Sequence, residues 1–323
     1  MSTDKWPVSA IKPRFRVITD NDYSGDPDGL VQLAHELLSP STETVAVIGT
    51  HLRMGDPWIR TDDTAAEAVA AAEKIVELCG LTGKVPVLKG AVPSMTDRKT
   101  AIDSEGVRAI IREALRDDTD QPLFVVCGAS LTEIASAWLL EPRIADRLTL
   151  VWIGGHEHDE LASPPPGGTD LEYNLHIDPI AAQVVFNDSN LKVWQFARDM
   201  YRTVIASRAE LYTRMRPHGE LGQHLYDSLG SVSSMIADMG FSTGEVYILG
   251  DSPLVLATAL QSIFEPDTSS SFHVVKPKPN ILDSGLYQEN PNGTPMRVYT
   301  QLDNRVLLED LYAKLEMHNQ GVK

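Results

Sequence analysis

Residues 15–30 read FRVITDNDYSGDPDGL, an apolar, β-rich run that passes directly into a turn with four aspartates. The four acids are Asp20, Asp22, Asp26 and Asp28. The run predicts a strand over about 14–19, and the pattern after the turn predicts a helix over about 28–38. A strand that passes through a short turn into a helix is typical of the first half of a βαβ unit. The segment therefore predicts an α/β fold with acidic side chains at the carboxyl end of its first strand.

The same alternation of short apolar runs and helical patterns continues along the chain. Further strands are expected at 44–49, 85–88, 123–127, 148–155 and 191–197, and helices at 61–79, 105–115, 131–140 and 179–186. Such repetition is typical of an open, mainly parallel central sheet with helices on both faces.

The remainder of the chain departs from this alternation. Residues 156–175 contain PPPGG and are expected to form a long loop. Later come a mostly helical region at 204–239, a helix from about Ser252, a strand pair around 271–276 and 296–302, and a closing amphipathic helix at 305–318. Since no linker, repeat or low-complexity tract is found, residues 1–323 are interpreted as one domain with a small helical excursion near 204–240.

Composition narrows the classes of function. Of 323 residues, 42% are hydrophobic and 23% charged, which is ordinary globular usage. A formal net charge of −17 repels phosphate backbones and anionic lipid, so neither nucleic acid nor a membrane surface is an expected partner. Cys79 and Cys127 lie in apolar runs and are expected to be buried thiols. No targeting segment or membrane span is recognised, which leads us to expect a soluble, cytoplasmic protein that binds a small molecule or a cation.

The four aspartates fall within nine residues. Carboxylates crowded in this way repel one another, and a hard divalent ion that prefers oxygen ligands relieves the repulsion. Calcium is the first expectation and magnesium the second. Turn and helix-cap chemistry accounts for Asp26 or Asp28 but not for all four acids. Asp20 is also compatible with a structural role, in which hydrogen bonds tie down the turn.

Five later segments are as distinctive as the acidic turn. They are GASLTEIASAWLLEPRIADRL, VWIGG, LEYNLHIDPIAAQVVF, WQFARD and LGDSPLVLATAL. Together with the turn they resemble the inosine-uridine-preferring nucleoside hydrolase family, whose signature D-x-D-P-G-x-D-D is interrupted here by Pro27. The resemblance implies that family's open α/β fold. It also implies calcium-dependent hydrolysis of the N-glycosidic bond of a ribonucleoside or related N-riboside, by a homodimer or homotetramer.

The resemblance also implies roles for single residues. Asp22 would ligate the calcium and act as the general base that activates a metal-held water. Asp28 and Asp251 would be further ligands, together with a backbone carbonyl that falls on Cys127 or Gly128. Asp26 would bind a ribose hydroxyl, although Asp26 and Asp28 can exchange roles because of the inserted proline. Asp251 is also placed to cap a helix.

Further residues are implied in sugar binding. Glu172 and Asn174 match the family's ribose-binding pair, a carboxylate and an amide suited to hydroxyl groups. His51 lies next to the position of a sugar-binding asparagine, and it either replaces that residue or hydrogen-bonds locally. Asp178, by contrast, is expected to start a helix.

Two departures from the family concern the leaving base. Gly250 stands where the family often has a histidine before the late aspartate, and a second active-site histidine has no counterpart. The proton donor is therefore unassigned, with candidates at His156, His158, Tyr201, His218 and His224. Aromatic side chains that could stack on a base are Tyr23, Trp152 and Tyr201.

Two other functions stay open at this point. The missing histidines are compatible with a protein that binds a ribosyl or sugar ligand on the same fold without turning it over. A magnesium-dependent phosphatase also places D-x-D after its first strand, although a convincing late acidic pair is missing from this sequence.

Overall fold

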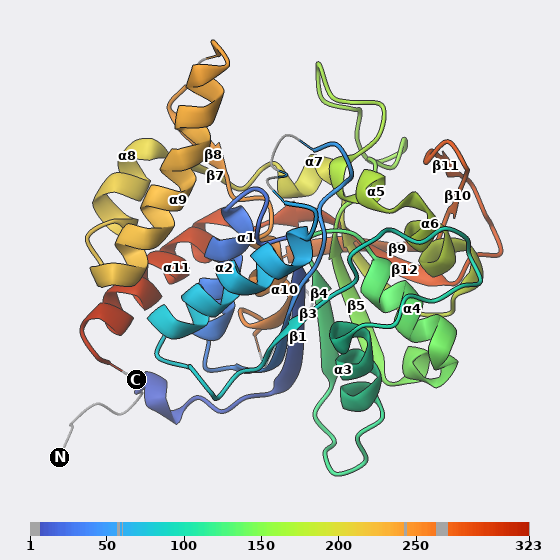
Figure 1. Cartoon of the computed structure of the whole chain (residues 1–323), viewed down its shortest axis with the longest axis horizontal. Helices are drawn as coiled ribbons and strands as arrows, with labels where there is room; N and C mark the ends of the chain where they lie inside the picture. Colours follow the sequence, from blue (N-terminus) through green and yellow to red (C-terminus); the bar gives the residue numbers. More distant parts are fainter. Residues whose placement is uncertain (1–6, 57–58, 60, 242–243, 263–270, 323) are drawn as a thin grey trace.

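An eight-stranded sheet runs through the computed structural model, which describes residues 7–56, 59, 61–241, 244–262 and 271–322 (Figure 1). The strand order is β3-β2-β1-β4-β5-β6-β12-β9. All neighbours pair in parallel except β12 and β9, which are antiparallel. The strands are β1 (Phe15–Asn21), β2 (Thr42–Gly49), β3 (Val87–Lys89), β4 (Leu123–Cys127), β5 (Leu148–Ile153), β6 (Lys192–Phe196), β9 (Ser271–Pro277) and β12 (Pro295–Leu302). The predicted mainly parallel sheet and the late strand pair are confirmed.

Both faces of the sheet are buried, as the unbroken apolar runs indicate. Every residue of β4 is buried, and so are residues 16–21 of β1. Successive side chains of a strand point to opposite faces. Accordingly, Ile18 joins the hydrophobic cluster on one face while its neighbour Val17 joins a cluster on the other. A parallel sheet covered on both sides is what such runs produce.

Two helical layers cover these faces. One layer contains α3 (Glu105–Ala114), α4 (Thr132–Leu140) and α6 (Pro179–Gln183), and the other contains α1 (Asp28–Leu37), α2 (Thr64–Leu78), α10 (Pro253–Thr258) and α11 (Asn304–Asn319). Figure 1 shows α1, α2 and α11 on one side of the sheet and α3 and α4 on the other. Several helices begin at a side-chain cap, and Asp178 caps α6 as predicted, accepting from the amide of Ala181 at 3.0 Å.

The excursion near 204–240 is mostly helical, as predicted, but it begins with a strand. β7 (Ile205–Ser207) pairs antiparallel with β8 (Val246–Ile248) outside the main sheet. Between them lie α8 (Arg208–Glu210), a π-helical turn (Leu211–Met215) and α9 (Gly219–Asp238), which packs beside α11 (Figure 1). Neither strand was expected from the sequence, because three residues are too few to show a period of two.

Shorter elements complete the fold. The loop after β5 is irregular up to α5 (Tyr173–Ile177), so the predicted loop over 156–175 extends three residues too far. The helix expected at 179–186 continues past α6 as a π-helical turn (Val184–Asp188). The remaining elements are α7 (Arg198–Tyr201), β10 (Asn280–Ile281), β11 (Tyr287–Gln288) and short 3-10 turns at Val8–Ala10 and Pro142–Asp146. Among the described residues, no helix combines the length and apolarity needed to span a membrane.

Candidate active site

A pocket of about 300 Å³ opens where β1, β4 and β5 end. In the sheet β1 lies between β2 and β4. The strands β2 and β3 extend the sheet from one side of β1, and β4, β5 and β6 extend it from the other, so the order of the strands reverses at β1. Open α/β sheets bind ligands at this reversal, outside the carboxyl ends of the strands. The lining includes eight candidate site residues that the sequence suggested, namely Asp22, Asp26, Asp28, Gly128, Glu172, Asn174, Tyr201 and Asp251.

Three buried aspartates are connected to one another through Asn21 and the backbone. Asn21 donates its side-chain amide to Oδ2 of Asp251 at 2.8 Å, while its own Oδ1 accepts from the backbone N–H of Asp22 at 2.9 Å. Oδ2 of Asp28 accepts from the backbone N–H of Asp251 at 3.1 Å. Asp251 therefore faces the acidic turn. Its alternative use as a helix cap is not found, since the N-cap residue of α10 is Ser252 and the helix has no side-chain cap hydrogen bond.

The pKa values of these three carboxyl groups are raised. Burial, followed by the charges of Asp251 and Asp26, raises the pKa of Asp22 well above its usual value. Burial and the same two neighbours raise the pKa of Asp28. The pKa of Asp251 rises to about 7, mainly through burial. Like charges held together away from water favour a cation among them.

The two remaining acids of the turn differ in position. Asp26 is exposed at the pocket, and its Oδ1 accepts a hydrogen bond of 2.6 Å from the hydroxyl of Tyr247 in β8. Asp20 is fully buried beneath the pocket, with its Oδ2 3.8 Å from Sγ of Cys127. Asp20 pairs with Cys127 in the register of β1 and β4, and its Oδ1 has no hydrogen-bond partner among the described residues, so the structural role suggested for it stays a prediction.

Glu172 and Asn174 lie at the start of α5. Glu172 is the N-cap of this helix and is completely buried. Asn174 donates its side-chain amide to the carbonyl oxygens of Gly128, at 3.0 Å, and Ile153, at 2.8 Å. These bonds tie α5 to the ends of β4 and β5, so the local structure explains how residues 172–174 reach the site.

His51 and Cys127 are placed less directly. His51 is buried, with its ring nitrogens 3.1 Å from the carbonyl oxygen of Ala91 and 3.2 Å from Oγ of Ser94. This matches the local hydrogen bonding that was the alternative to sugar binding. At the end of β4, Gly128 lines the pocket, whereas Cys127 is not among the lining residues that the structure describes.

Of the candidates Tyr201, Tyr23, Trp152, His156 and His158, one lines the pocket and the others are buried elsewhere. Tyr201 lines the pocket. His156 and His158 are buried outside the described lining, although loop histidines are usually expected at the surface. Trp152 lies in the core instead of at the pocket, and Tyr23 is buried with its hydroxyl 2.8 Å from Oγ1 of Thr19.

Other site residues were not found from the sequence. They are Asn21, Ile153, Tyr173, Tyr247 and Ile248. The position of Asn21 inside the acidic turn was the one available signal. Ile153 is the last residue of β5 and Tyr173 is the first residue of α5, whereas Tyr247 and Ile248 belong to the unexpected strand β8.

The chemistry of the pocket fits a hard cation. Asp22, Asp28 and Asp251 offer only oxygen donors, and their raised pKa values reflect a local shortage of positive charge. Within the described part of the chain, however, no three His, Cys, Asp or Glu side chains already have the arrangement of a formed metal site.

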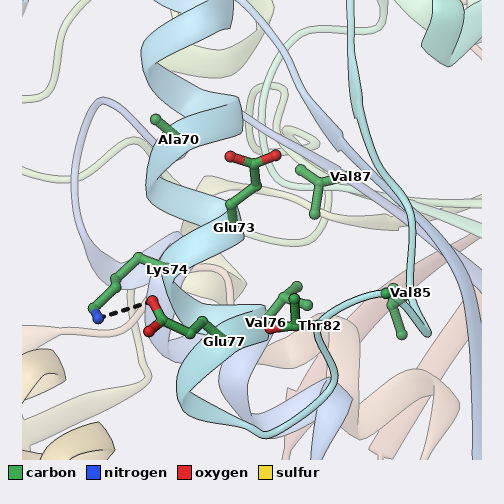
Figure 2. Close-up of a pocket in the computed structure, with 9 residues that line it drawn as sticks. Ala70, Glu73, Lys74, Val76, Glu77, Thr82, Val85 and Val87 are labelled. Carbon is green, nitrogen blue, oxygen red and sulfur yellow. Dashed lines mark hydrogen bonds and ion pairs between the residues drawn. The ribbon is translucent and has the colours of Figure 1, made fainter.

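A second hollow, of about 510 Å³, lies on the outside of α2 and shares no lining residue with the aspartate pocket. Figure 2 shows Glu73 and Glu77 of α2 there, with Glu77 paired to Lys74 at 2.9 Å. It lies at the amino-end approach to β3, around Val85 and Val87, rather than at the carboxyl ends of the central strands. The aspartate pocket is therefore the candidate active site.

Comparisons with known proteins agree with this geometry. The chain is 27% identical over 203 residues to an inosine-uridine preferring nucleoside hydrolase of Crithidia fasciculata, covering 56% of this chain and 58% of that protein. It is 37% identical over 101 residues to the protein of the same name from Leishmania major, covering 31% of each. The matched stretches thus span about a third to somewhat over half of these relatives.

Solved structures show the same fold over nearly the whole chain. A purine-preferring ribonucleoside hydrolase from Gardnerella vaginalis superposes with a TM-score of 0.73 at 19% identity, covering 94% of this chain and 99% of that one. A plant nucleoside hydrolase gives a TM-score of 0.71 at 16% identity with the same coverage. The model of the family described as inosine-uridine preferring nucleoside hydrolase matches residues 17–305. Fold, pocket and family match lead to one conclusion: the chain belongs to the inosine-uridine preferring nucleoside hydrolase family.

Proposed function

We propose that this protein is a calcium-dependent nucleoside hydrolase that cleaves the N-glycosidic bond of a ribonucleoside or related N-riboside into base and ribose. The observation that carries the proposal is the convergence of Asp22, Asp28 and Asp251 on one pocket, in a chain that belongs to this family. The curated relatives named above are inosine-uridine preferring, which suggests these two nucleosides as first substrates.

The acids suit the charge that the reaction develops. Breaking an N-glycosidic bond leaves positive charge on the ribose, in an oxocarbenium-like transition state, and negative groups beside the sugar stabilise that charge. Asp22, whose carboxylate lines the pocket, would take the proton from the attacking water. When bound, a calcium ion would supply the positive charge that keeps the neighbouring carboxylates ionised and would polarise the water.

The proposed ligands are Asp22, Asp28 and Asp251, with a backbone carbonyl at the end of β4. Asp28 is favoured over Asp26 because it is buried and bonded to the backbone of Asp251, whereas Asp26 is exposed and bonded to Tyr247. Asp26 is therefore proposed for a ribose hydroxyl. Both amide N–H groups of Asn174 are committed to carbonyls, so Asn174 would recognise the sugar through its Oδ1 as an acceptor.

A second candidate is binding of a ribosyl ligand without turnover. Gly250 beside Asp251 favours it, because the histidine that often precedes this aspartate in the family is absent. Membership of the nucleoside hydrolase family leaves the phosphatase alternative without support.

The test is a panel of nucleosides that includes inosine and uridine, with release of ribose measured with and without a chelator. We expect the wild type to release ribose with calcium, chelation to stop it, and Asp22→Asn to lose at least a hundredfold in kcat. Asp120→Asn, an exposed acid before β4, should keep wild-type activity. Calorimetric binding of ribose without any release of ribose from the panel would favour the second candidate. Equal activity of Asp22→Asn and wild type would remove Asp22 from the base role.

A further inference from the structure

The loop after β5 (residues 154–172) is buried near its start and exposed beyond it. Residues 156–158 are buried, whereas most of residues 159–170 are exposed. A turn begins at the last of the buried residues, because the carbonyl oxygen of His158 accepts from the N–H of Leu161 at 2.7 Å. His158 is therefore a point at which the exposed part of the loop is attached to the protein.

The ring of His158 contacts three strands, and both of its nitrogens have a partner. Nε2 lies 2.9 Å from Oε1 of Gln195 in β6, and Nδ1 lies 3.0 Å from Nζ of Lys276 in β9. The ring also packs on Tyr287 of β11, with the ring centroids 5.3 Å apart. This one side chain thus joins the loop to β6, β9 and β11.

These partners fix the protonation state of His158. An ammonium group donates hydrogen bonds and cannot accept them, so Nδ1, which faces Lys276, is the nitrogen without a proton. Gln195 donates its Nε2 to the carbonyl oxygen of Gly154 at 2.8 Å, which orients the amide and leaves its Oε1 as an acceptor for His158. Nε2 of His158 therefore carries the proton, and the contacts belong to the neutral ring.

A second proton on His158 would convert one of these contacts into a repulsion. The proton would add at Nδ1, so the acceptor facing Lys276 would become a donor and two cations would lie 3.0 Å apart. The pKa of His158 is lowered chiefly by burial and further by the charge of Lys276, although the hydrogen bond to Gln195 opposes the shift. The attached loop therefore holds His158 neutral.

The other charged groups near His158 do not replace the lost contact. Glu160 and Asp159 of the same loop favour the protonated ring, but the carboxylate of Glu160 is already paired with Lys276 and is 59% exposed. Tyr287 is uncharged, because burial raises the pKa of its hydroxyl. His156 packs on the other partner of this cluster, the ring of Tyr287, at a centroid distance of 5.5 Å. Lys276 thus remains the group that decides the sign of the interaction.

We infer that His158 is a pH-sensitive switch, whose neutral ring attaches the loop after β5 to β6 and β9 and whose protonation releases the exposed part of that loop. A released ring is open to water and binds its proton near pH 6.5, whereas the attached ring binds it only at lower pH, so acid favours release. Arg198 still holds Glu157, at 2.7 and 2.8 Å, so the start of the loop stays in place. The switch concerns the loop itself and is independent of the proposed function.

The experiment measures hydrogen exchange of the full-length protein by mass spectrometry at about pH 7.5 and about pH 5, on either side of the ordinary histidine pKa. Each rate is divided by the intrinsic exchange rate at that pH. The reporting peptide contains Leu161 and Ala162, whose N–H groups both bond to the carbonyl oxygen of His158. Strand β4 reports the stability of the whole fold. Relative to β4, we expect the wild-type loop to lose protection about threefold or more at the lower pH.

Three variants test the mechanism. His158→Gln keeps a neutral polar side chain that cannot take up a proton, so its loop should show less than this change. Lys276→Gln removes the opposing cation from a partly exposed position, so protonation of His158 no longer produces a repulsion and the response should likewise be lost. His224→Gln, at a half-buried histidine of α9, is the matched control and should respond as wild type does.

Each result supports or overturns the switch. A wild-type loop that loses less than about threefold of its protection relative to β4 overturns it. The full wild-type response in His158→Gln assigns the effect to another group, and the full response in Lys276→Gln overturns the repulsion. Titration of the histidine ring signals of the wild-type protein by nuclear magnetic resonance needs no variant. His158 should titrate below its ordinary pKa of about 6.5, and titration at or above that value also overturns the switch.

Discussion

The side-chain amide of Asn21 donates a 2.8 Å hydrogen bond to Oδ2 of Asp251, which joins the end of β1 to a turn 230 residues further along the chain. Asn21 also lies against two glycines. A Cβ added to Gly29 would lie 2.9 Å from Nδ2 of Asn21, and one added to Gly128 would collide with the same atom. This neutral amide therefore separates and orients acids that would otherwise repel one another.

Replacing Asn21 with Asp should destabilise the protein in the absence of divalent metal. The change removes a donor from Asp251 and places a new carboxylate beside it, which costs about 1–3 kcal/mol. Urea unfolding with chelator measures the free energy of unfolding. Asn292→Asp, in an exposed turn, is the control and should be close to neutral. A stability of Asn21→Asp equal to wild type would show that this amide does not hold Asp251 in place.

Calcium should raise the melting temperature of the wild-type protein, because an ion that binds only the folded state stabilises it by an amount that grows with the logarithm of the ion concentration above Kd. Asp28→Asn and Asp251→Asn should remove most of this shift, whereas Asp26→Asn should keep it. Differential scanning fluorimetry with calcium, magnesium or chelator gives the comparison. Loss of the shift in Asp26→Asn with its retention in Asp28→Asn would mean that the two acids exchange roles.

Arg198 should hold down the long loop after β5. Its guanidinium makes a bidentate pair with Glu157, at 2.7 and 2.8 Å, and donates to the carbonyl oxygen of Thr169 at 2.8 Å. Both partners of the pair are buried. Arg198→Ala leaves a buried carboxylate without its partner, which costs about 3–5 kcal/mol. We expect faster limited proteolysis within the loop, mapped by mass spectrometry.

A matched pair is available as a control for this prediction. Arg143 binds Glu141 with the same bidentate geometry, but its side chain is 75% exposed. Exposed pairs contribute about 0–1 kcal/mol, so Arg143→Ala should leave proteolysis and stability nearly unchanged. Equal proteolysis rates for Arg198→Ala and Arg143→Ala would contradict the anchoring role of Arg198.

His35 should make stability fall at acid pH. Burial lowers its pKa to about 4, although Asp310 lies 2.8 Å from Nε2 and opposes the shift, and Lys314 adds to it. The unfolded chain binds this proton near pH 6.5 and the folded one near pH 4, so stability is full above pH 6.5 and decreases as the pH falls towards 4. By pH 4 the loss is about 3 kcal/mol.

In His35→Asn the free energy of unfolding should decrease less than in wild type between pH 7 and pH 4. Urea titration at each pH measures it. His218→Asn, at a partly exposed position before α9, should keep the wild-type slope. An unchanged slope in His35→Asn would assign the acid sensitivity to other groups.

The sheet was predictable because its strands are covered on both faces and read as continuous apolar runs. Residues 123–127 were predicted with the bounds that the structure gives to β4. The strands β7 and β8 were not predicted, because three residues paired outside the main sheet leave no periodic signal. Ile248, which lines the pocket, and Tyr247, which bonds to Asp26, consequently come from a segment in which the sequence analysis expected no strand.

The sequence by itself determined that acids follow the first strand, that the sheet is mainly parallel and that a late aspartate precedes a helix, because spacing and hydrophobic pattern are local properties. Only the tertiary structure decided which side chains face the pocket and which are already hydrogen-bonded to other parts of the protein. The carboxylate of Glu172 accepts hydrogen bonds from the backbone N–H groups of Gly155, Asn174 and Leu175. The ring of His51 bonds to the carbonyl oxygen of Ala91, and the ring of Tyr201 lies beside Gly250. Those outcomes depend on contacts between segments far apart in the chain, which local pattern does not encode.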